Sequence, residues 1–346
     1  MKKLFTSIIV LMLSTFAWGQ HYVFDEMIHD GGAGDDKIYD ICLDNAGNKY
    51  IAGTFKETLD FGNGVAITAI DNADGFIAKY DASGNALWAH SMGATLTDYC
   101  DAIAVDSAGN VITSARFYKT IIFGSDTLTS TGSWDIAVVK FDSDGNYLWM
   151  KQITSGDGLM DQSYDLQVDS KGNYVLLGMF DINDSLSYTL HYEGLEIPTH
   201  GERDIFVLKM DSDGNPIWGV NGGGRENDYP GGLVIDEDDN IYFTGFYDDS
   251  TGVFGDTELA CAGGRDVVVA KLDTLGVYQW AVSATGTGDD EGLAIEYVEG
   301  GTVLITGSFT ESLTPGDFIS AGDDDIFVLA LDASSGSYVG GYSFGG

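Results

Sequence analysis

The sequence of 346 residues carries 54 acidic and 16 basic side chains, which gives a formal charge of −38, and 44% of its residues are apolar. So acidic a chain is unsuited to bind nucleic acid or an anionic membrane surface. Its 47 glycines and only 4 prolines, with 18 Tyr and 18 Phe, indicate many short strands joined by tight turns.

The first 19 residues have the pattern of a signal peptide. Two lysines precede an apolar run over residues 4–16, and small residues precede a cleavage site between Gly19 and Gln20. The apolar run is shorter than the ~20 residues that a membrane-spanning helix needs, and no later run is long enough. The pattern predicts export to the medium or to the outer cell surface, without a transmembrane segment.

From residue 20 onward the chain is predicted to be one domain (20–346) built from a repeated unit. A strand at residues 22–28 matches the end of a unit. Five units follow, and each opens with a short strand, a turn that usually reads Asp-x-x-Gly-Asn, and a second strand. The units cover residues 36–97, 98–160, 161–227, 228–289 and 290–346. The turn aspartates are Asp44, Asp106, Asp169 and Asp236, and Val298 holds this place in the fifth unit.

A loop that often contains Phe-Gly leads to the second half of each unit, as at Phe61, Phe123 and Phe254, and predicts a bulge or a small extra hairpin. The third strand is an almost continuous apolar run, so both of its faces should be buried. This strand is expected at 75–80, 136–141, 205–210, 267–272 and 326–331. A second Asp turn and a strand with a Trp close the unit, and these residues are Trp88, Trp149, Trp218 and Trp280.

Two hairpins per unit make a four-stranded antiparallel sheet, and sheets that are buried on both faces must stack on one another. Radial stacking gives an all-β fold, a β-propeller with five complete blades in a ring that is possibly incomplete. A linear solenoid of sheets is the alternative. Further blades and a sorting domain beyond Gly346 are one expectation. A closed five-blade ring is the other, with residues 22–28 competing with residues 337–343 for the edge of the fifth blade.

The order of the repeated residues is specific. It runs apolar-Asp-x-x-Gly-Asn, then Phe-Gly, then Asp-apolar-apolar-apolar-x-Lys-x-Asp-x-x-Gly-Asn-x-x-Trp. This pattern resembles the SBBP repeat, the bacterial seven-bladed β-propeller repeat, over essentially the whole mature chain. The resemblance implies an exported bacterial scaffold, often found beside adhesive domains, and it says little about a ligand. Similar proteins often carry a C-terminal sorting domain, which this sequence does not contain.

Two series of aspartates recur once per unit. The first could gather near one tunnel mouth and bind calcium, or each member could bond the backbone of its own turn. Its members are Asp36, Asp98, Asp161, Asp228 and Asp290. The second precedes the third strand, with a Lys five residues later in four units, and is predicted to form structural contacts between blades or within turns. Its members are Asp74, Asp135, Asp204, Asp266 and Asp325, followed by Lys79, Lys140, Lys209, Lys271 and, in place of Lys, Ala330.

The candidate ligand-binding residues belong to two groups. Tyr99, Tyr164 and Tyr229 lie near the blade entries and would stack on a sugar or peptide, or else pack on neighbouring loops. His191, His200 and Glu202 share the longest loop, in unit three. The Trp residues are predicted to pack between blades, in a manner similar to the docking tryptophans of quinoprotein propellers. Three cysteines, an odd number, do not form a disulfide framework, although one pair could form between neighbouring strands.

No catalytic residues are predicted, and no cofactor is required. The favoured function is a non-catalytic exported scaffold that binds protein or glycan at the cell surface. One alternative is a secreted enzyme acting on polysaccharide through two carboxylates about 5–9.5 Å apart at the tunnel mouth. Another is a structural ring stabilised by calcium.

Overall fold

The computed structural model describes residues 34–93, 96–156, 160–181, 189–248 and 251–345, and this part of the chain is built of strands. The predicted signal peptide and the strand expected at 22–28 lie outside the described residues. Within the described ranges there is no helix long and apolar enough to cross a membrane.

Each repeat contributes four long strands to one antiparallel sheet, in the order expected from two hairpins, and these sheets are called blades one to five. Blade one is β1 (Lys37–Leu43), β2 (Lys49–Phe55), β5 (Asp74–Tyr80) and β6 (Ala86–Met92). Blade two is β7 (Tyr99–Val105), β8 (Val111–Phe117), β11 (Asp135–Phe141) and β12 (Tyr147–Ile153). Blade three is β13 (Asp161–Val168), β14 (Tyr174–Asp181), β17 (Arg203–Met210) and β18 (Pro216–Gly223). Blade four is β19 (Tyr229–Ile235), β20 (Ile241–Asp248), β23 (Arg265–Leu272) and β24 (Tyr278–Gly286). Blade five is β25 (Asp290–Val298), β26 (Thr302–Phe309), β29 (Asp325–Asp332) and β30 (Tyr338–Phe344).

A small hairpin lies between the second and third strand of every unit, where Phe-Gly predicted a bulge or hairpin. In units four and five it pairs with the last strand of the preceding blade, as Phe254 does with Gly222. It therefore joins consecutive blades at their outer edge. The hairpins are β3 (Thr58–Asp60) with β4 (Ala66–Thr68), β9 (Thr120–Phe123) with β10 (Asp126–Thr129), β15 (Thr189–Tyr192) with β16 (Leu195–Pro198), β21 (Thr251–Phe254) with β22 (Thr257–Ala260), and β27 (Ser312–Thr314) with β28 (Phe318–Ile319).

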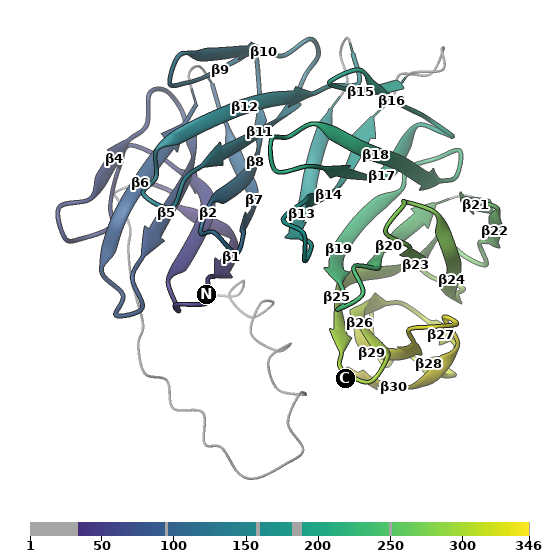
Figure 1. The fold of residues 1–346 in the computed structure, drawn as a ribbon. Helices are drawn as coiled ribbons and strands as arrows, with labels where there is room; N and C mark the ends of the chain where they lie inside the picture. Colours follow the sequence, from purple (N-terminus) through teal and green to yellow (C-terminus); the bar gives the residue numbers. More distant parts are fainter. Residues whose placement is uncertain (1–33, 94–95, 157–159, 182–188, 249–250, 346) are drawn as a thin grey trace.

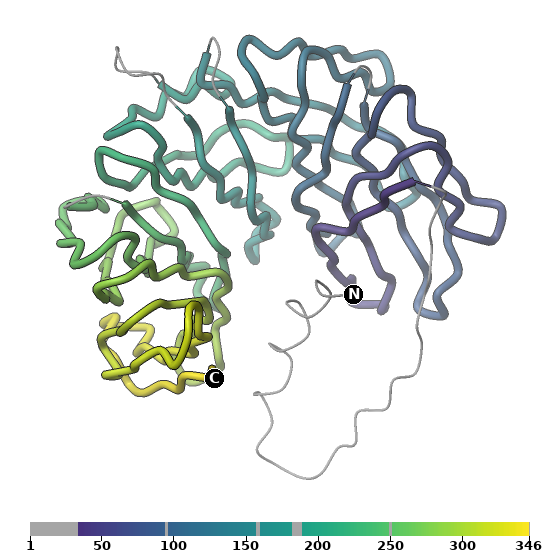
Figure 2. Tube along the Cα trace, turned by 180° about the vertical axis from the view of Figure 1, so that it is seen from behind, coloured from purple at the N-terminus to yellow at the C-terminus, as the bar shows by residue number. Residues whose placement is uncertain are grey.

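The blades are arranged radially in an open arc of propeller type (Figure 1). The first strands β1, β7, β13, β19 and β25 each contact the next one and line the inside of the arc. This convergence excludes the linear solenoid for the described blades. Blades one and five stand apart at the two ends of the arc, as the view from behind also shows (Figure 2). The outer edge of blade five is occupied by β30, which confirms the fourth strand expected at 337–343.

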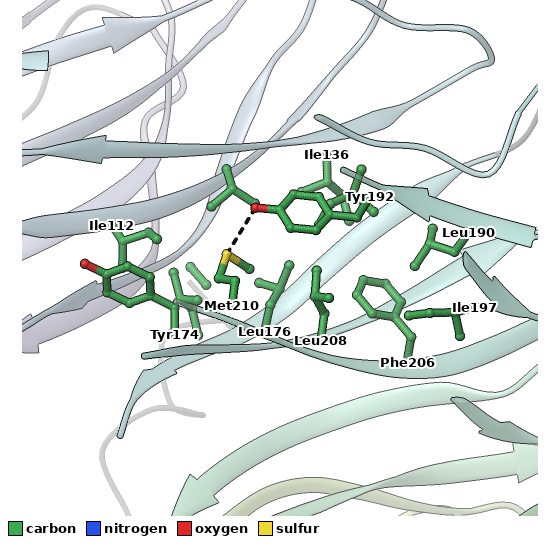
Figure 3. Packing of buried hydrophobic residues seen from close by; sticks show 14 of the residues in the cluster. Ile112, Ile136, Tyr174, Leu176, Leu190, Tyr192, Ile197, Phe206, Leu208 and Met210 are labelled. Carbon is green, nitrogen blue, oxygen red and sulfur yellow. Dashed lines mark hydrogen bonds between the residues drawn. The ribbon is translucent and has the colours of Figure 1, made fainter. Parts of the chain in front are cut away.

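The third strands of the first four blades are almost fully buried, as their continuous apolar runs predict. For blade five the prediction is wrong, because buried residues alternate with more exposed ones along β29 and Ile326 is exposed. Every residue of β5 and β11 is buried. The core lies between blades, where side chains from facing sheets interdigitate. Figure 3 shows one such layer, in which Ile136 of blade two packs with Leu176 and Leu208 of blade three. There the hydroxyl of Tyr192 lies 3.4 Å from the sulfur of Met210.

Each Trp packs across a seam, which is the contact surface between two consecutive blades. A Cβ added to Gly145, in the second turn of blade two, would lie 2.9 Å from the Trp88 ring of blade one. The same relation holds between Gly214 and Trp149, Gly276 and Trp218, and Gly336 and Trp280. The prediction that the tryptophans pack between blades is confirmed, and the turn glycine is needed at the seam for space as well as for its backbone conformation.

The Lys series also bonds across seams. Lys79 and Lys140 donate to the carbonyl oxygens of Ser143 and Ser212 in the next blade, at 2.8 and 2.6 Å. Lys271 donates likewise to Ala333, at 3.2 Å. The aspartates of the second series instead close a local turn, because each accepts the backbone N–H four residues earlier. Both predicted structural roles are thus present, and they are divided between the two residue types.

We expect Gly145→Ala to cost about 1–3 kcal/mol more than Gly172→Ala, because only the first methyl group meets a neighbouring ring. Both glycines have left-handed backbone, with φ of +82° and +80°, so the backbone strain is matched. Nothing lies within 4 Å of a Cβ at Gly172. Urea denaturation of the two variants measures the difference, and equal losses would show that the Trp88 contact contributes nothing.

The three cysteines are free, so no pair forms between neighbouring strands. Cys100 is buried, while Cys42 and Cys261 are partly exposed. The fold therefore depends on seam packing and turn hydrogen bonds rather than on cross-links.

Candidate functional site

The side of the molecule at which the first and third strands of each blade begin carries residues that are not repeated from blade to blade. In each blade the first strand has a bulge near its start, where one extra residue is inserted into the strand. The bulged residues are Tyr39, Asp101, Tyr164, Gly231 and Leu293. The residues two positions before each bulge, which are in equivalent register, also differ. They are Lys37, Tyr99, Gln162, Tyr229 and Glu291. Because these positions differ, the five blades present five different surfaces here.

We call the aromatic and arginine side chains at this end the axial rim. Its residues are Tyr39, Tyr99, Arg116, Trp134, Tyr164, Arg203 and Tyr229. In the first half of the rim, the guanidinium carbon of Arg116 lies 4.3 Å from the centre of the Tyr99 ring and 5.8 Å from that of Trp134. The rings of Tyr99 and Trp134 are themselves 5.5 Å apart, and Tyr39 meets Tyr99 edge-on at 6.1 Å. A guanidinium held against aromatic faces gains cation–π attraction.

The charge of Arg116 is balanced by the bulged Asp101, with 3.1 Å between Nε and Oδ2. Burial raises the pKa of Asp101 to about 7, and the neighbouring guanidinium opposes this rise. Since both side chains are largely buried, the pair fixes the cation between the rings. The bulge therefore serves to bring a counter-charge under the aromatic cluster.

The second half of the rim repeats this chemistry with other residues. The guanidinium carbon of Arg203, at the start of β17 in blade three, lies 4.5 Å from the ring centre of Tyr229 in blade four. Its Nη2 lies 2.8 Å from Oδ2 of Asp181. Burial raises the pKa of Tyr164, and Arg203 and Arg116 both lower it, so this phenol lies within the field of both arginines. Arg265 extends the series beyond the rim by lying over Phe246 and contacting Glu291.

Arginine is concentrated at this end of the molecule. The sequence has four arginines, at 116, 203, 225 and 265, and three of them lie over aromatic rings here. The turns at the opposite strand ends carry aspartates, whose carboxylates accept backbone N–H groups, as Asp211 does from Asp213 and Asn215. The three arginines and the rings they contact thus lie at one end of the strands, with acidic partners for each arginine, and the turn aspartates lie at the other end.

Tyr99 contacts Arg116, Tyr229 contacts Arg203, and the charges of both arginines act on Tyr164. That these tyrosines bind a ligand stays a prediction. The structure separates the other candidates. His191 lies on β15 with Nδ1 3.8 Å from Oε1 of Glu196, and Nδ1 of His200 lies 3.0 Å from the side-chain nitrogen of Asn221.

Glu202 is exposed in the turn before β17, and only its backbone bonds the adjacent loop. The described part of the unit-three loop forms the same hairpin as in the other units, and its remaining length, 182–188, lies outside the described residues. The histidines and Glu202 therefore contact different residues and do not form a joint site.

The first aspartate series is distributed one residue to a seam rather than around one mouth. Asp98, Asp161, Asp228 and Asp290 are fully buried, and Asp36 lies at the open end of blade one. Asp161 accepts the N–H and the hydroxyl of Ser155, at 2.8 and 2.6 Å. Across the described ranges no three His, Cys, Asp or Glu side chains come together as metal ligands would.

Sequence reasoning missed Arg116, Trp134 and Arg203, although a signal for the arginines was present. An arginine is rare in this acidic chain, and each of these two follows or precedes an aromatic-rich strand end.

No protein-family model matches the chain. Over 268 residues, 64% of its length, the chain is 25% identical to an uncharacterised WD repeat-containing protein of Acanthamoeba polyphaga mimivirus, and it spans only 19% of that protein. Among solved structures, a quinohemoprotein alcohol dehydrogenase from Pseudomonas putida is 12% identical, with 89% of this chain and 52% of that chain covered and a TM-score of 0.40. A DUF4221 family protein from Bacteroides vulgatus is 11% identical, with coverage of 92% and 85% and a TM-score of 0.38. The chain is thus similar to a repeat protein, and at these TM-scores the structural likenesses carry no further argument.

Proposed function

We propose that this protein is an exported, non-catalytic scaffold of propeller type that binds a protein or glycan ligand through the axial rim. The observation that carries the proposal is the clustering of non-repeated aromatic rings with fixed guanidinium groups at one end of an otherwise repetitive fold. Residues that recur in every blade stabilise the fold, so a ligand-binding site is expected among the residues that differ between blades. Aromatic faces give contact area to sugar rings and peptides, and the cations favour ligands that carry carboxylates or other acceptors.

A scaffold is favoured over the polysaccharide hydrolase by the placement of the carboxylates. Hydrolysis requires two carboxylates that reach a substrate. The aspartate pairs of this structure recur in the same arrangement at successive seams, and their side chains are buried, out of reach of a substrate. Export would remove residues 1–19, and N-terminal sequencing of the secreted protein is expected to read from Gln20. Calcium stabilisation remains a proposal that thermal melts with calcium and with EDTA would test.

Binding is expected to depend on Tyr39, whose ring is exposed and contacts Tyr99. The purified mature protein would be screened against glycan and peptide arrays, and each hit would be titrated by calorimetry. We expect Tyr39→Ala to weaken binding about tenfold or more, since loss of a stacking ring removes about 1–2 kcal/mol. The matched control is Tyr338→Ala, which removes a similarly exposed tyrosine from blade five. Hits that both variants bind with unchanged affinity would contradict a site on the rim.

A further inference from the structure

Every seam between described blades contains two aspartates that approach each other. The aspartate before the third strand of one blade meets the aspartate before the first strand of the next blade. The four pairs are Asp74 with Asp98, Asp135 with Asp161, Asp204 with Asp228, and Asp266 with Asp290. All eight residues are at most 1% exposed. Two carboxylates in one dry pocket cannot both ionise without a large electrostatic cost.

The carboxylates of a pair point at the same small space, which a glycine leaves open in seams one and three. A Cβ on Gly93 would lie 2.7 Å from Oδ1 of Asp74 and 2.8 Å from Oδ2 of Asp98. A Cβ on Gly223 would likewise meet Oδ1 of Asp204 and Oδ2 of Asp228. In both seams, one oxygen of each carboxylate therefore borders the same space.

A count of hydrogen bonds shows which oxygens lack a donor. Oδ2 of Asp74 accepts the Ile70 N–H and the Ser91 hydroxyl, at 3.0 and 2.7 Å, while its Oδ1 accepts nothing. Oδ2 of Asp204 accepts from the backbone of His200 and from the Asn221 amide, and again its Oδ1 accepts nothing. The oxygens without a donor on Asp74 and Asp204 are those that border the space shared with the partner carboxylate. Neither oxygen of Asp290 has a hydrogen-bond partner either. In seam three the partner oxygen, Oδ2 of Asp228, accepts the Gly224 N–H. Seam two differs, because both oxygens of Asp135 and of Asp161 accept hydrogen bonds.

We propose that the pairs in seams one, three and four each bind one proton, which the two carboxylates share in an O–H···O hydrogen bond between blades. The proton removes one of the two negative charges and supplies the donor that one of their oxygens lacks. The pair then carries a single negative charge, held by the surrounding N–H groups. A metal ion fits less well, because calcium takes six to eight oxygen ligands and the remaining neighbours of these carboxylates are donors. Each of these three seams is thus a proton-binding site between blades.

The charged surroundings agree with a retained proton. Burial, with repulsion from Asp204, raises the pKa of Asp228 to about 8, although the Gly224 N–H opposes this. Burial, with repulsion from Asp266, raises that of Asp290 to about 7. The other titratable or charged groups facing the third pair are His200, Asp248, Tyr278 and Arg203. Those facing the fourth pair are Asp289, Cys261 and Tyr247.

The sign of the pH dependence follows from the raised pKa. An unfolded Asp releases its proton near pH 3.9, so between that pH and about 8 the folded chain holds a proton that the unfolded chain has lost. The stabilisation is complete below the unfolded pKa, and it disappears as the pH rises through about 7 to 8. Each of the three pairs should therefore make the fold less stable at pH 9 than at pH 6.

The test is the stability of the whole mature chain from pH 5 to 9 with Asp228→Asn, whose amide donates to Asp204 permanently. We expect the urea midpoint of the wild-type protein to fall as the pH rises across this range. The midpoint of the variant should fall less steeply, by the contribution of one proton, and should lie at a higher urea concentration than that of the wild-type protein at pH 9. Asp144→Asn removes the same charge from an exposed turn and should leave the slope unchanged. Asp290→Asn provides the same comparison in seam four if Asp228→Asn fails to fold. Infrared difference spectra should show a carboxylic-acid carbonyl band at pH 6 that each seam variant diminishes.

Three results would overturn the proposal. The first is a slope that both seam variants leave unchanged. The second is the absence of a carboxylic-acid band in the wild-type protein at pH 6. The third is a melting temperature that calcium raises and EDTA lowers in the wild-type protein but not in the seam variants, which would identify the bound cation as a metal.

Discussion

Replacing Asp169 with Asn is expected to lower the free energy of unfolding by about 3–5 kcal/mol, because it leaves the ammonium group of Lys209 buried without a counter-charge. Nζ of Lys209 lies 2.8 Å from Oδ2 of Asp169, and the two side chains are 3% and 0% exposed. Burial alone would raise the pKa of Asp169. The hydrogen bonds from Lys209 and Asn173 outweigh burial and hold the pKa below its ordinary value. This contribution is present above the ordinary pKa of an aspartate and is lost as the pH falls through the lowered value.

The neighbouring blade supplies the control for this prediction. Asp106 occupies the same turn in blade two, but there Lys140 donates to the Ser212 carbonyl instead. Asp106→Asn should therefore cost only about 1 kcal/mol, the usual net contribution of a hydrogen bond. In urea titrations at pH 7, Lys209→Met added to Asp169→Asn should recover part of the loss, since it removes the unpaired charge. Equal costs for the two Asn variants would show that Lys209 is not an obligatory partner.

The fold was predictable because its determinants are local and repeated. Gly145 and Gly214 mark turns, and the runs at 136–141 and 205–210 mark buried strands. Because the spacing is regular, the same pattern predicts the same strands in every unit. The packing of Trp149 between blades could also be predicted, since a large ring at a fixed place in each repeat must meet the same neighbour each time. In such a chain, a strand that is hard to assign in one unit can be assigned from the equivalent residues of the other four.

The site was less predictable because it depends on register and on exceptions to the repeat. Tyr99 meets Arg116 because they face each other across β7 and β8, just before a bulge that spacing alone does not reveal. The aspartate pairs were also hidden, since Asp204 and Asp228 belong to different blades and each looked like a turn residue by itself. Tyrosines near blade entries could be selected. The rarity of arginine points to Arg116 and Arg203, but no motif indicates which ring each of them contacts.

Lys209 is an exception of this kind, because its ammonium group pairs with Asp169 of its own blade. In the first two seams the Lys holds the carbonyl of the facing turn, but in the third seam the indole N–H of Trp218 donates to the corresponding carbonyl of Thr274, at 3.0 Å. Lys209 bonds within its own blade. In the fourth seam, by contrast, Lys271 and the indole N–H of Trp280 both donate to the carbonyl of Ala333. Trp218 therefore serves both as a packing residue and as the cross-seam donor.

Trp218→Ala is accordingly expected to cost about 3 kcal/mol, the lower end of the range for removing a large aromatic ring, because Trp218 is partly exposed. The ring packs on Gly276, where an added Cβ would lie 2.6 Å from it, so truncation opens a cavity that the rigid turn cannot fill. Trp218→Phe keeps most of the packing and removes the donor to Thr274, so it should cost about 1–3 kcal/mol. Urea denaturation followed by circular dichroism measures both values.

The order of these two losses distinguishes packing from hydrogen bonding at the seam. If the alanine and phenylalanine variants lose the same stability, the Thr274 hydrogen bond carries the contact and the ring contributes little. If the phenylalanine variant keeps wild-type stability, Lys209 has moved to the vacated carbonyl. In that case Trp218→Phe should also make Asp169→Asn less costly. The double variant tests this directly, because the two sites couple only through the position of the Lys209 ammonium group.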